Sequence, residues 1–154
     1  MNKAQLEGQW GFMNMVLGNA RRQIELMPED KLDFRPTPEI RSASELAAHM
    51  HLYLTELTET VLQGKHIDNE APKFQSKAEL LNWMSEQVKK GNANFAKIAD
   101  AQLGQTIEAW GQPFQGWQLV AFCPTEVLHH RGQFTTYLRL IGIEPVFVYD
   151  FDAK

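Results

Sequence analysis

The chain has 154 residues, 44% of them hydrophobic, and a formal net charge of -4 at pH 7. This length and apolar content predict one domain, residues 1–154, with a core that needs no cross-links. No run of Lys or Arg is longer than a pair, so neither nucleic acid nor an anionic membrane surface is expected as a partner.

The only cysteine is Cys123, which excludes an internal disulfide and is typical of a reducing compartment. The first residues are too polar for a signal peptide, and no stretch is long and apolar enough to span a bilayer. We therefore expect a cytoplasmic protein whose partners are small molecules or other proteins.

The first segment carries apolar residues at alternating steps of three and four, the spacing of one face of an amphipathic helix. They are Leu6, Trp10, Met13, Leu17, Ala20, Ile24 and Met27. A helix is therefore predicted from about Asn2 to Met27, where Pro28 ends it. The next stretch, PEDKLDFRPTPEIRS, is expected to be a linker, because each proline disfavours helix at the residue before it.

Ser42 followed by Glu45 forms a capping-box motif that predicts the start of a second helix, and Gly64 is placed to end it in the left-handed conformation. The apolar stripe between them consists of Leu46, Met50, Tyr53, Leu57 and Val61. His49 lies on this stripe and is expected to be buried, whereas His51 is rotated by about 200 degrees and is expected to face solvent.

Residues 64–75 predict an exposed connection. A second capping-box motif, Ser76 with Glu79, starts a third helix, whose apolar stripe extends to Ile98. Signals are weaker over the next stretch, where TIEAWGQPFQGW favours a short extended excursion.

A last helix is predicted from about Trp117 to Ile141, with Gly142 as its cap. Pro124 falls inside it, so the helix either kinks or restarts there. The tail beyond it alternates enough to be extended. Four amphipathic helices joined by three linkers predict an all-α fold, a four-helix bundle with a long connection between its second and third helices and an extended C-terminal tail.

Glu126 and His130 are four residues apart on the last helix, so their side chains stand on one face and can hold one ion together. His49 on the second helix offers a third ligand, while His129 is rotated about 100 degrees off that face. Three protein ligands leave positions open for water or substrate, as in a reactive metal site. Two histidines and one carboxylate suit zinc and non-haem Fe(II), and nickel or manganese is also acceptable, so the ligand set does not choose the metal.

A structural explanation is open for the same residues. His49 can be a core histidine satisfied by a hydrogen bond, and Glu126 with His130 can be an ion pair along one helix. Nearby, Cys123 is expected to act as a small hydrophobic residue, and Tyr53 either orients a ligand or packs in the core.

Neighbours of His130 carry further expectations. Gly132 lies inside the last helix, where glycine costs about 1 kcal/mol relative to alanine, so we expect another helix backbone to approach it closely. Arg131 and Gln133 flank the ligand face and are expected to bond the neighbouring linker or a second copy of the chain.

Three stretches resemble the DinB-like family, which is related to YfiT-type proteins: PEDKLDFRP after the first helix, SASELAAHM at the start of the second, and HHRGQFTTYLRLIGIEP at the end of the last. The resemblance covers nearly the whole chain in order and spacing. It implies a four-helix bundle of up-down-down-up course, commonly a homodimer, with a divalent metal held by three histidines. The first and third of these fall on His49 and His130.

The second histidine of the family pattern falls on Glu126, which departs from the pattern. We therefore predict a metal site of His49, Glu126 and His130. The added negative charge favours harder ions and lowers the expected affinity for zinc. Zinc and nickel are still the first expectation for the metal, with iron and manganese as alternatives.

The better-understood relatives are transferases and isomerases that use a low-molecular-weight thiol such as bacillithiol or mycothiol. The resemblance therefore implies a metal-dependent S-transferase, in which a thiol bound to the metal loses its proton and attacks an electrophile. A non-catalytic, stress-related metal-binding protein that forms dimers is the alternative. The family name also suggests contact with DNA, which the negative charge opposes.

Overall fold

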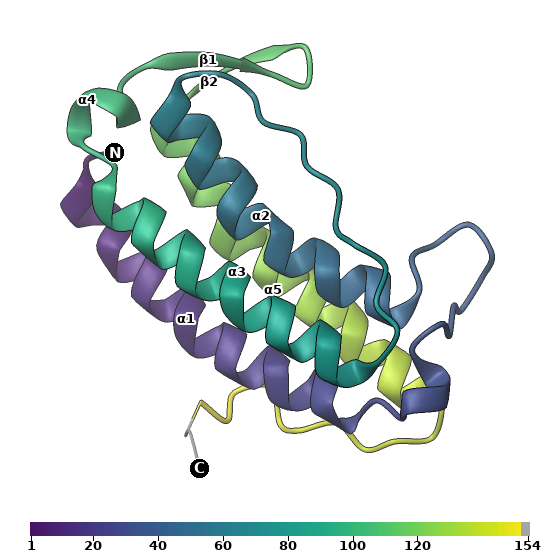
Figure 1. Ribbon diagram of the computed structural model, residues 1–154. Helices are drawn as coiled ribbons and strands as arrows, with labels where there is room; N and C mark the ends of the chain where they lie inside the picture. The colour runs from purple at the N-terminus through teal and green to yellow at the C-terminus, as the bar shows by residue number, and fades with distance from the viewer. Residues whose placement is uncertain (152–154) are drawn as a thin grey trace.

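The computed structural model describes residues 1–151 and is mostly helical. Within these residues, the long helices that lie side by side (Figure 1) are α1 (Lys3–Leu26), α2 (Ala43–Gln63), α3 (Lys77–Lys97) and α5 (Gly116–Leu140). The short elements are the 3-10 helix η1 (Glu29–Lys31), the helix α4 (Asp100–Leu103), and the strands β1 (Thr106–Ala109) and β2 (Gln112–Gln115). The predicted helical class is confirmed, and a small sheet is added to it.

The long connection between α2 and α3 follows from the directions of the helices. In Figure 1, α1 and α5 run away from the end of the molecule that carries the hairpin, whereas α2 and α3 run towards it. α2 packs mainly against α3 and α5, and α1 packs mainly against α5. Because α2 and α3 are neighbours that run in the same direction, the chain returns along the molecule between them, as residues 64–76.

Side-chain caps fix where the central helices begin and end. Ser42 accepts a hydrogen bond from the backbone N–H of Glu45, whose carboxylate accepts one from the N–H of Ser42, so the predicted capping box is present. At α3, Ser76 accepts from the N–H of Glu79, but the Glu79 carboxylate accepts from the N–H of Gln75 instead. Gly64 ends α2 with a φ of 67°, the left-handed cap that was predicted.

α5 runs as one helix through Pro124, so it does not restart there. Beyond its end, Gly142 has a φ of 81°. The N–H groups of Gly142 and Ile143 donate to the carbonyl oxygens of Arg139 and Leu138. These bonds satisfy carbonyls that the helix end leaves open, and they confirm Gly142 as part of the cap.

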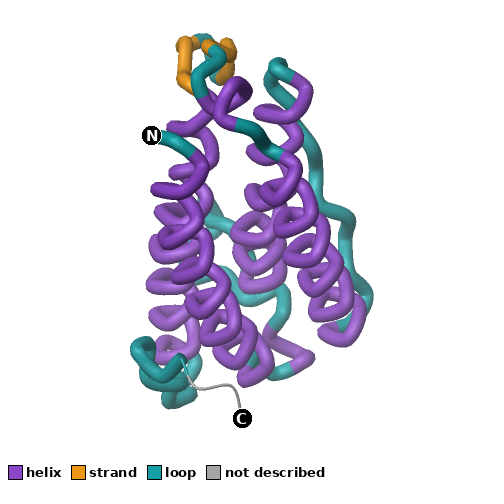
Figure 2. The backbone as a smooth tube through the Cα atoms, turned by 90° about the vertical axis from the view of Figure 1, so that its left-hand side faces the viewer, coloured by secondary structure: helices purple, strands orange, loops and turns teal. Residues whose placement is uncertain are grey.

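The short extended excursion that was expected before α5 is an antiparallel hairpin, drawn in orange in Figure 2. Ala109 pairs with Gln112, which leaves a two-residue turn made of Trp110 and Gly111. Both turn residues have positive φ, 50° and 71°, as a type I′ turn requires.

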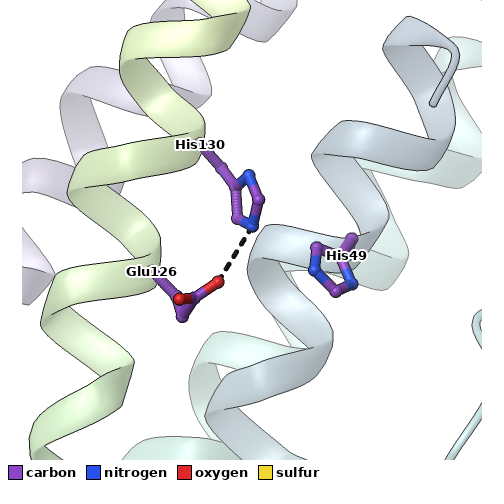
Figure 3. Close-up of side chains that lie close together, drawn as sticks. All are labelled: His49, Glu126 and His130. Carbon is purple, nitrogen blue, oxygen red and sulfur yellow. Dashed lines mark hydrogen bonds and ion pairs between the residues drawn. The ribbon is translucent and has the colours of Figure 1, made fainter. Parts of the chain in front are cut away.

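α2 is buried on two sides because it packs against both α3 and α5. His51 is therefore only 1% exposed, and its Nδ1 lies 2.7 Å from the carbonyl oxygen of Ala47. The expectation that His51 faces solvent is wrong, since the apolar stripe marks only one of the two buried faces. His49, which was expected to be buried, is half-buried on the side that faces α5 (Figure 3).

Close backbone approach occurs at Gly91 and not at Gly132. A Cβ atom built at Gly91 would lie 2.8 Å from the Cβ of Leu54 and 3.2 Å from its carbonyl oxygen. At Gly132, apart from its two chain neighbours and the nearby backbone of α5 itself, no atom in the described part of the chain comes within 4 Å of such a position. The close approach expected at Gly132 is therefore wrong.

The segment after α5 is irregular and is held by side chains of α1 and α5. Asn19 and Gln23 donate through their amides to the carbonyl oxygens of Phe147 and Val146, at 3.0 and 2.8 Å. Arg131 donates to the carbonyl oxygen of Val148 at 2.6 Å, so its bond within the chain goes to the tail, and the expected contact with a second copy stays a prediction. The rest of the tail predicted to be extended, residues 152–154, lies outside the described residues.

Among residues 1–151, no helix combines the length and the apolar character that crossing a membrane requires.

Candidate metal centre

The three residues predicted as metal ligands lie together where α2 faces α5 (Figure 3). His49 comes from α2, and Glu126 and His130 come from successive turns of α5. One ligand atom from each residue lies within 4.8 Å of the other two. Ligand atoms sit about 2 Å from a bound transition metal, so small side-chain rotations are enough to close this group around one ion.

His130 is only 5% exposed and uses both of its ring nitrogens. Nδ1 lies 2.8 Å from Oε1 of Gln133, and Nε2 lies 3.0 Å from Oε2 of Glu126. An amide oxygen can only accept a hydrogen bond, so Nδ1 carries a proton. In the neutral ring, Nε2 then turns a lone pair towards a carboxylate, and two acceptors at this distance need a proton or a cation between them.

Gln133 fixes the orientation of the His130 ring. Its Nε2 lies 3.0 Å from Nε2 of His129, so the amide donates to His129 and its oxygen is left to accept from His130. Such outer partners commonly orient a histidine that binds metal. Gln133 was expected to bond a linker or a second copy. Within the described chain it bonds two histidines of α5, and the contact with a second copy stays a prediction. Its spacing of three and four residues from the two histidines could have revealed this role.

His49 is held in its neutral form. Burial is the main cause that lowers its pKa to about 4, and the positive charge of Arg41, with any charge on His130, acts in the same direction. The ring therefore has a lone pair to offer at pH 7 without first losing a proton. It faces the ring of His130, with the centroids 4.8 Å apart and the planes at 70°. The ring of Tyr53 also lies against it, with the centroids 4.7 Å apart in an edge-on contact.

Glu126 completes the group with an ionisable oxygen. Its side chain is 30% exposed and turns towards His130, as Figure 3 shows. Two imidazole nitrogens and one carboxylate form a set that binds divalent transition metals. Nε2 of His130, the neutral His49 and the charge of Glu126 therefore fit a divalent cation. Without an ion, a proton on Nε2 makes the ion pair with Glu126 that was the structural alternative.

Three cavities adjoin the group, and each is lined by a different member of it. A cavity of about 750 Å³ is lined by His130, and one of about 890 Å³ by His49. Arg41 lines both of these cavities, is exposed, and makes no ion pair within residues 1–151. A third cavity of about 380 Å³ is lined by Glu126. A small molecule can thus approach the group from more than one side.

Two further residues near the group were considered from the sequence. Cys123 is fully buried, its Sγ donates to the carbonyl oxygen of Tyr53 at 3.6 Å, and burial raises the pKa of its thiol. It is therefore an inert core residue, as expected. The Tyr53 hydroxyl makes no hydrogen bond within the described residues, and its ring lines the cavity beside Glu126. Of the alternative in which Tyr53 packs in the core with a bonded hydroxyl, the packing is confirmed, because the half-buried ring packs against the core. The bonded hydroxyl is wrong for the described residues.

The fold and the site together define a class of protein, one that is mostly helical and gathers its candidate metal ligands from two neighbouring helices. The chain belongs to the DinB family, whose family model matches residues 15–154.

Solved structures with the same fold include two proteins described as DinB-like or DinB family members. One, from Bacillus subtilis, is 21% identical, has a TM-score of 0.68, and aligns over 88% of this chain and 95% of its own. The other, from Exiguobacterium sibiricum, is 19% identical, has a TM-score of 0.67, and aligns over 97% of both chains.

A third structure with this fold is the mycothiol-dependent maleylpyruvate isomerase. It is 15% identical, has a TM-score of 0.63, and aligns over 87% of this chain and 63% of its own. At such identities these likenesses show the fold alone. No curated protein sequence matches this chain significantly.

Proposed function

We propose that this chain is a divalent-metal-dependent enzyme of the DinB family that transfers a low-molecular-weight thiol to a small electrophile. The observation that carries the proposal is the group of His49, Glu126 and His130, with ligand atoms within 4.8 Å of one another. The likeness in fold to a mycothiol-dependent isomerase supports a thiol as cosubstrate. Zinc and nickel are the first candidates for the metal, and iron and manganese are the alternatives.

A divalent ion held by this group would act as a Lewis acid and lower the pKa of a thiol, so that the thiolate is available at neutral pH. In the transfer a C–S bond forms, the bond to the leaving group breaks, the leaving group keeps the electron pair, and the thiol proton passes to solvent. Gln133 holds the His130 ring in place for this chemistry. Arg41, which lines two of the adjoining cavities, supplies positive charge for an anionic part of the thiol.

The second candidate is a non-catalytic metal-binding protein in which the ion stabilises the fold and a homodimer. The observation that favours it is the origin of the ligands on two helices, because an ion between them would link α2 to α5. This candidate predicts a large rise in melting temperature on metal loading and no turnover of thiol with any electrophile.

Metal content tests both candidates. The protein is purified without chelator, loaded with zinc, nickel, Fe(II) or manganese, and analysed by mass spectrometry. We expect close to stoichiometric metal that is lost in His49→Ala and His130→Ala and reduced in Glu126→Gln. His66→Ala is the matched control, since His66 lies outside the group. Absence of metal under every loading condition refutes both candidates.

Turnover then separates the candidates. The loaded protein is mixed with bacillithiol or mycothiol and 1-chloro-2,4-dinitrobenzene, whose thioether product is followed by absorbance. The enzyme proposal expects metal-dependent turnover that His49→Ala abolishes. Metal binding that raises the melting temperature, without turnover of a panel of electrophiles, supports the second candidate instead.

A further inference from the structure

One of the three cavities differs from the others in its lining. The cavity of about 380 Å³ beside Glu126 is lined by four aromatic residues and that single carboxylate. The lining residues are Tyr53, Trp110, Phe114, Phe122 and Glu126. We call this cavity the aromatic slot. It joins the hairpin to α2 and α5, and it ends at a member of the candidate metal group.

The rings of the slot are ordered by contacts with one another. Trp110 meets Phe114 with centroids 5.8 Å apart, and Phe114 meets Phe122 at 5.5 Å, both edge-on at 79°. On the α2 side, Tyr53 meets His49 edge-on at 4.7 Å. Edge-to-face contacts of this kind are favourable for aromatic rings. The contacts therefore run from the hairpin to α5 on one side and from Tyr53 to the metal group on the other.

The position of Trp110 is not explained by the stability of the hairpin. It occupies a two-residue turn with a φ of 50°, where Asn, Asp or Gly is preferred and a bulky residue is disfavoured. The residue is also 47% exposed, and besides Phe114 its ring meets His66 edge-on at 5.0 Å, a contact at the surface. Burial in the core therefore does not explain the choice. A large ring held over a cavity in this way is instead suited to contact a ligand.

We propose that the aromatic slot binds the aromatic ring of a small molecule whose polar head reaches the candidate metal group at Glu126. A ring placed there leaves water and gains edge or face contacts with four others. The volume lies near the lower end of the range for ligand pockets, about 300–1,000 Å³, and suits one or two fused rings. This inference rests on the proposed function and specifies the electrophile of the transfer as aromatic.

The test uses two probes that bind metal through the same head. Benzohydroxamate carries a ring and acetohydroxamate carries a methyl group in its place. Each is titrated calorimetrically into the zinc-loaded full chain. We expect benzohydroxamate to bind at least about tenfold more tightly. Equal affinities of the two probes would refute the aromatic slot as a binding site and would not count against the metal centre.

The variant Trp110→Asn tests whether the difference in affinity between the two hydroxamates arises at the slot. Asparagine suits the positive φ of the turn, so this variant keeps the hairpin while it removes the ring. We expect benzohydroxamate affinity to fall about fivefold or more with acetohydroxamate affinity unchanged. The matched control is Tyr149→Asn, which removes an aromatic ring that is 68% exposed and does not line the slot. Equal losses in the two variants overturn the proposal.

A metal-free titration separates failure of the slot from failure of the metal centre. The probe is p-cresol, which has a ring and no strong metal-binding group, and the signal is the indole N–H resonance of Trp110, identified by its loss in Trp110→Phe. We expect p-cresol to shift this resonance. If neither hydroxamate binds but p-cresol shifts the resonance, the proposed metal centre is refuted and the proposed aromatic binding site is supported. If p-cresol leaves the resonance unchanged, the slot is overturned.

Discussion

Lowering the pH is expected to destabilise the protein through His51. This side chain is 1% exposed, and burial lowers its pKa to about 4 despite the hydrogen bond to Ala47, with the charge of Arg21 adding to the effect. In the unfolded chain a histidine takes up a proton near pH 6.5. Between these values the unfolded state binds more protons than the folded state, so stability falls as the pH falls. Linkage gives a loss of about 2 kcal/mol between pH 7.5 and pH 5.

Urea unfolding of the metal-free protein measures this loss. Wild type and His51→Gln are compared at both pH values in the presence of a chelator, so that metal binding adds no pH dependence. Glutamine keeps a polar side chain but does not titrate in this range. His49 and all other titrating groups are shared, so the difference between the two proteins isolates His51. We expect wild type to lose about 2 kcal/mol more than the variant. The same pH dependence in both would refute a buried neutral His51.

Three further predictions concern single residues. Gln133→Leu is expected to weaken zinc binding about 10- to 100-fold, because His130 loses its orienting partner. Competition with a chromophoric chelator measures the zinc affinity, and an unchanged affinity would contradict the role of Gln133 in orienting His130. Gly91→Ala is expected to lower the free energy of unfolding by about 1–3 kcal/mol through overpacking, whereas Gly132→Ala is expected to raise it by up to about 1 kcal/mol. Equal effects of the two variants in urea unfolding would contradict the close approach at Gly91. Trp110→Asn is expected to change that free energy by less than about 1 kcal/mol, because relief of the positive φ offsets the lost ring contacts with Phe114 and His66. A loss of several kcal/mol in urea unfolding would show instead that the ring is structural.

The helices could be predicted because their signals are local. Ser42 with Glu45 and the glycine at 64 set the ends of α2 through hydrogen bonds and φ values that depend on a few residues. Burial is different, since it depends on how many neighbours a helix has. The apolar stripe of α2 identified one buried face of the helix. α2 lies between α3 and α5, however, and His51 is on its second buried face. Gly132 was misjudged for the same reason.

The candidate site was likewise predictable only where it depends on local spacing. Glu126, His130 and Gln133 lie within two turns of one helix, so their spacing alone brings them together. His49 joins them only through the packing of α2 on α5. The apolar stripe of α2 suggests such packing but does not fix the position of His49 relative to α5. The slot could not be predicted, because Trp110 lies in a stretch with weak periodicity, and only the hairpin brings it over the helices.

Charge around the group constrains how any substrate pair would lie. Arg41 lines the cavities on the sides of His49 and His130, and Glu126 lines the slot. On the first side Arg41 offers a cation to an anionic thiol, although Glu45 lines the same two cavities. Among the residues that the structure describes, the only charged group in the lining of the slot is the Glu126 carboxylate, which repels an anion and leaves the slot suited to an uncharged ring. Under the proposed function, the thiol therefore enters from the side of Arg41 and the aromatic electrophile from the hairpin. The glutamate that departs from the three-histidine pattern would then help to keep the two substrates on opposite sides of the metal.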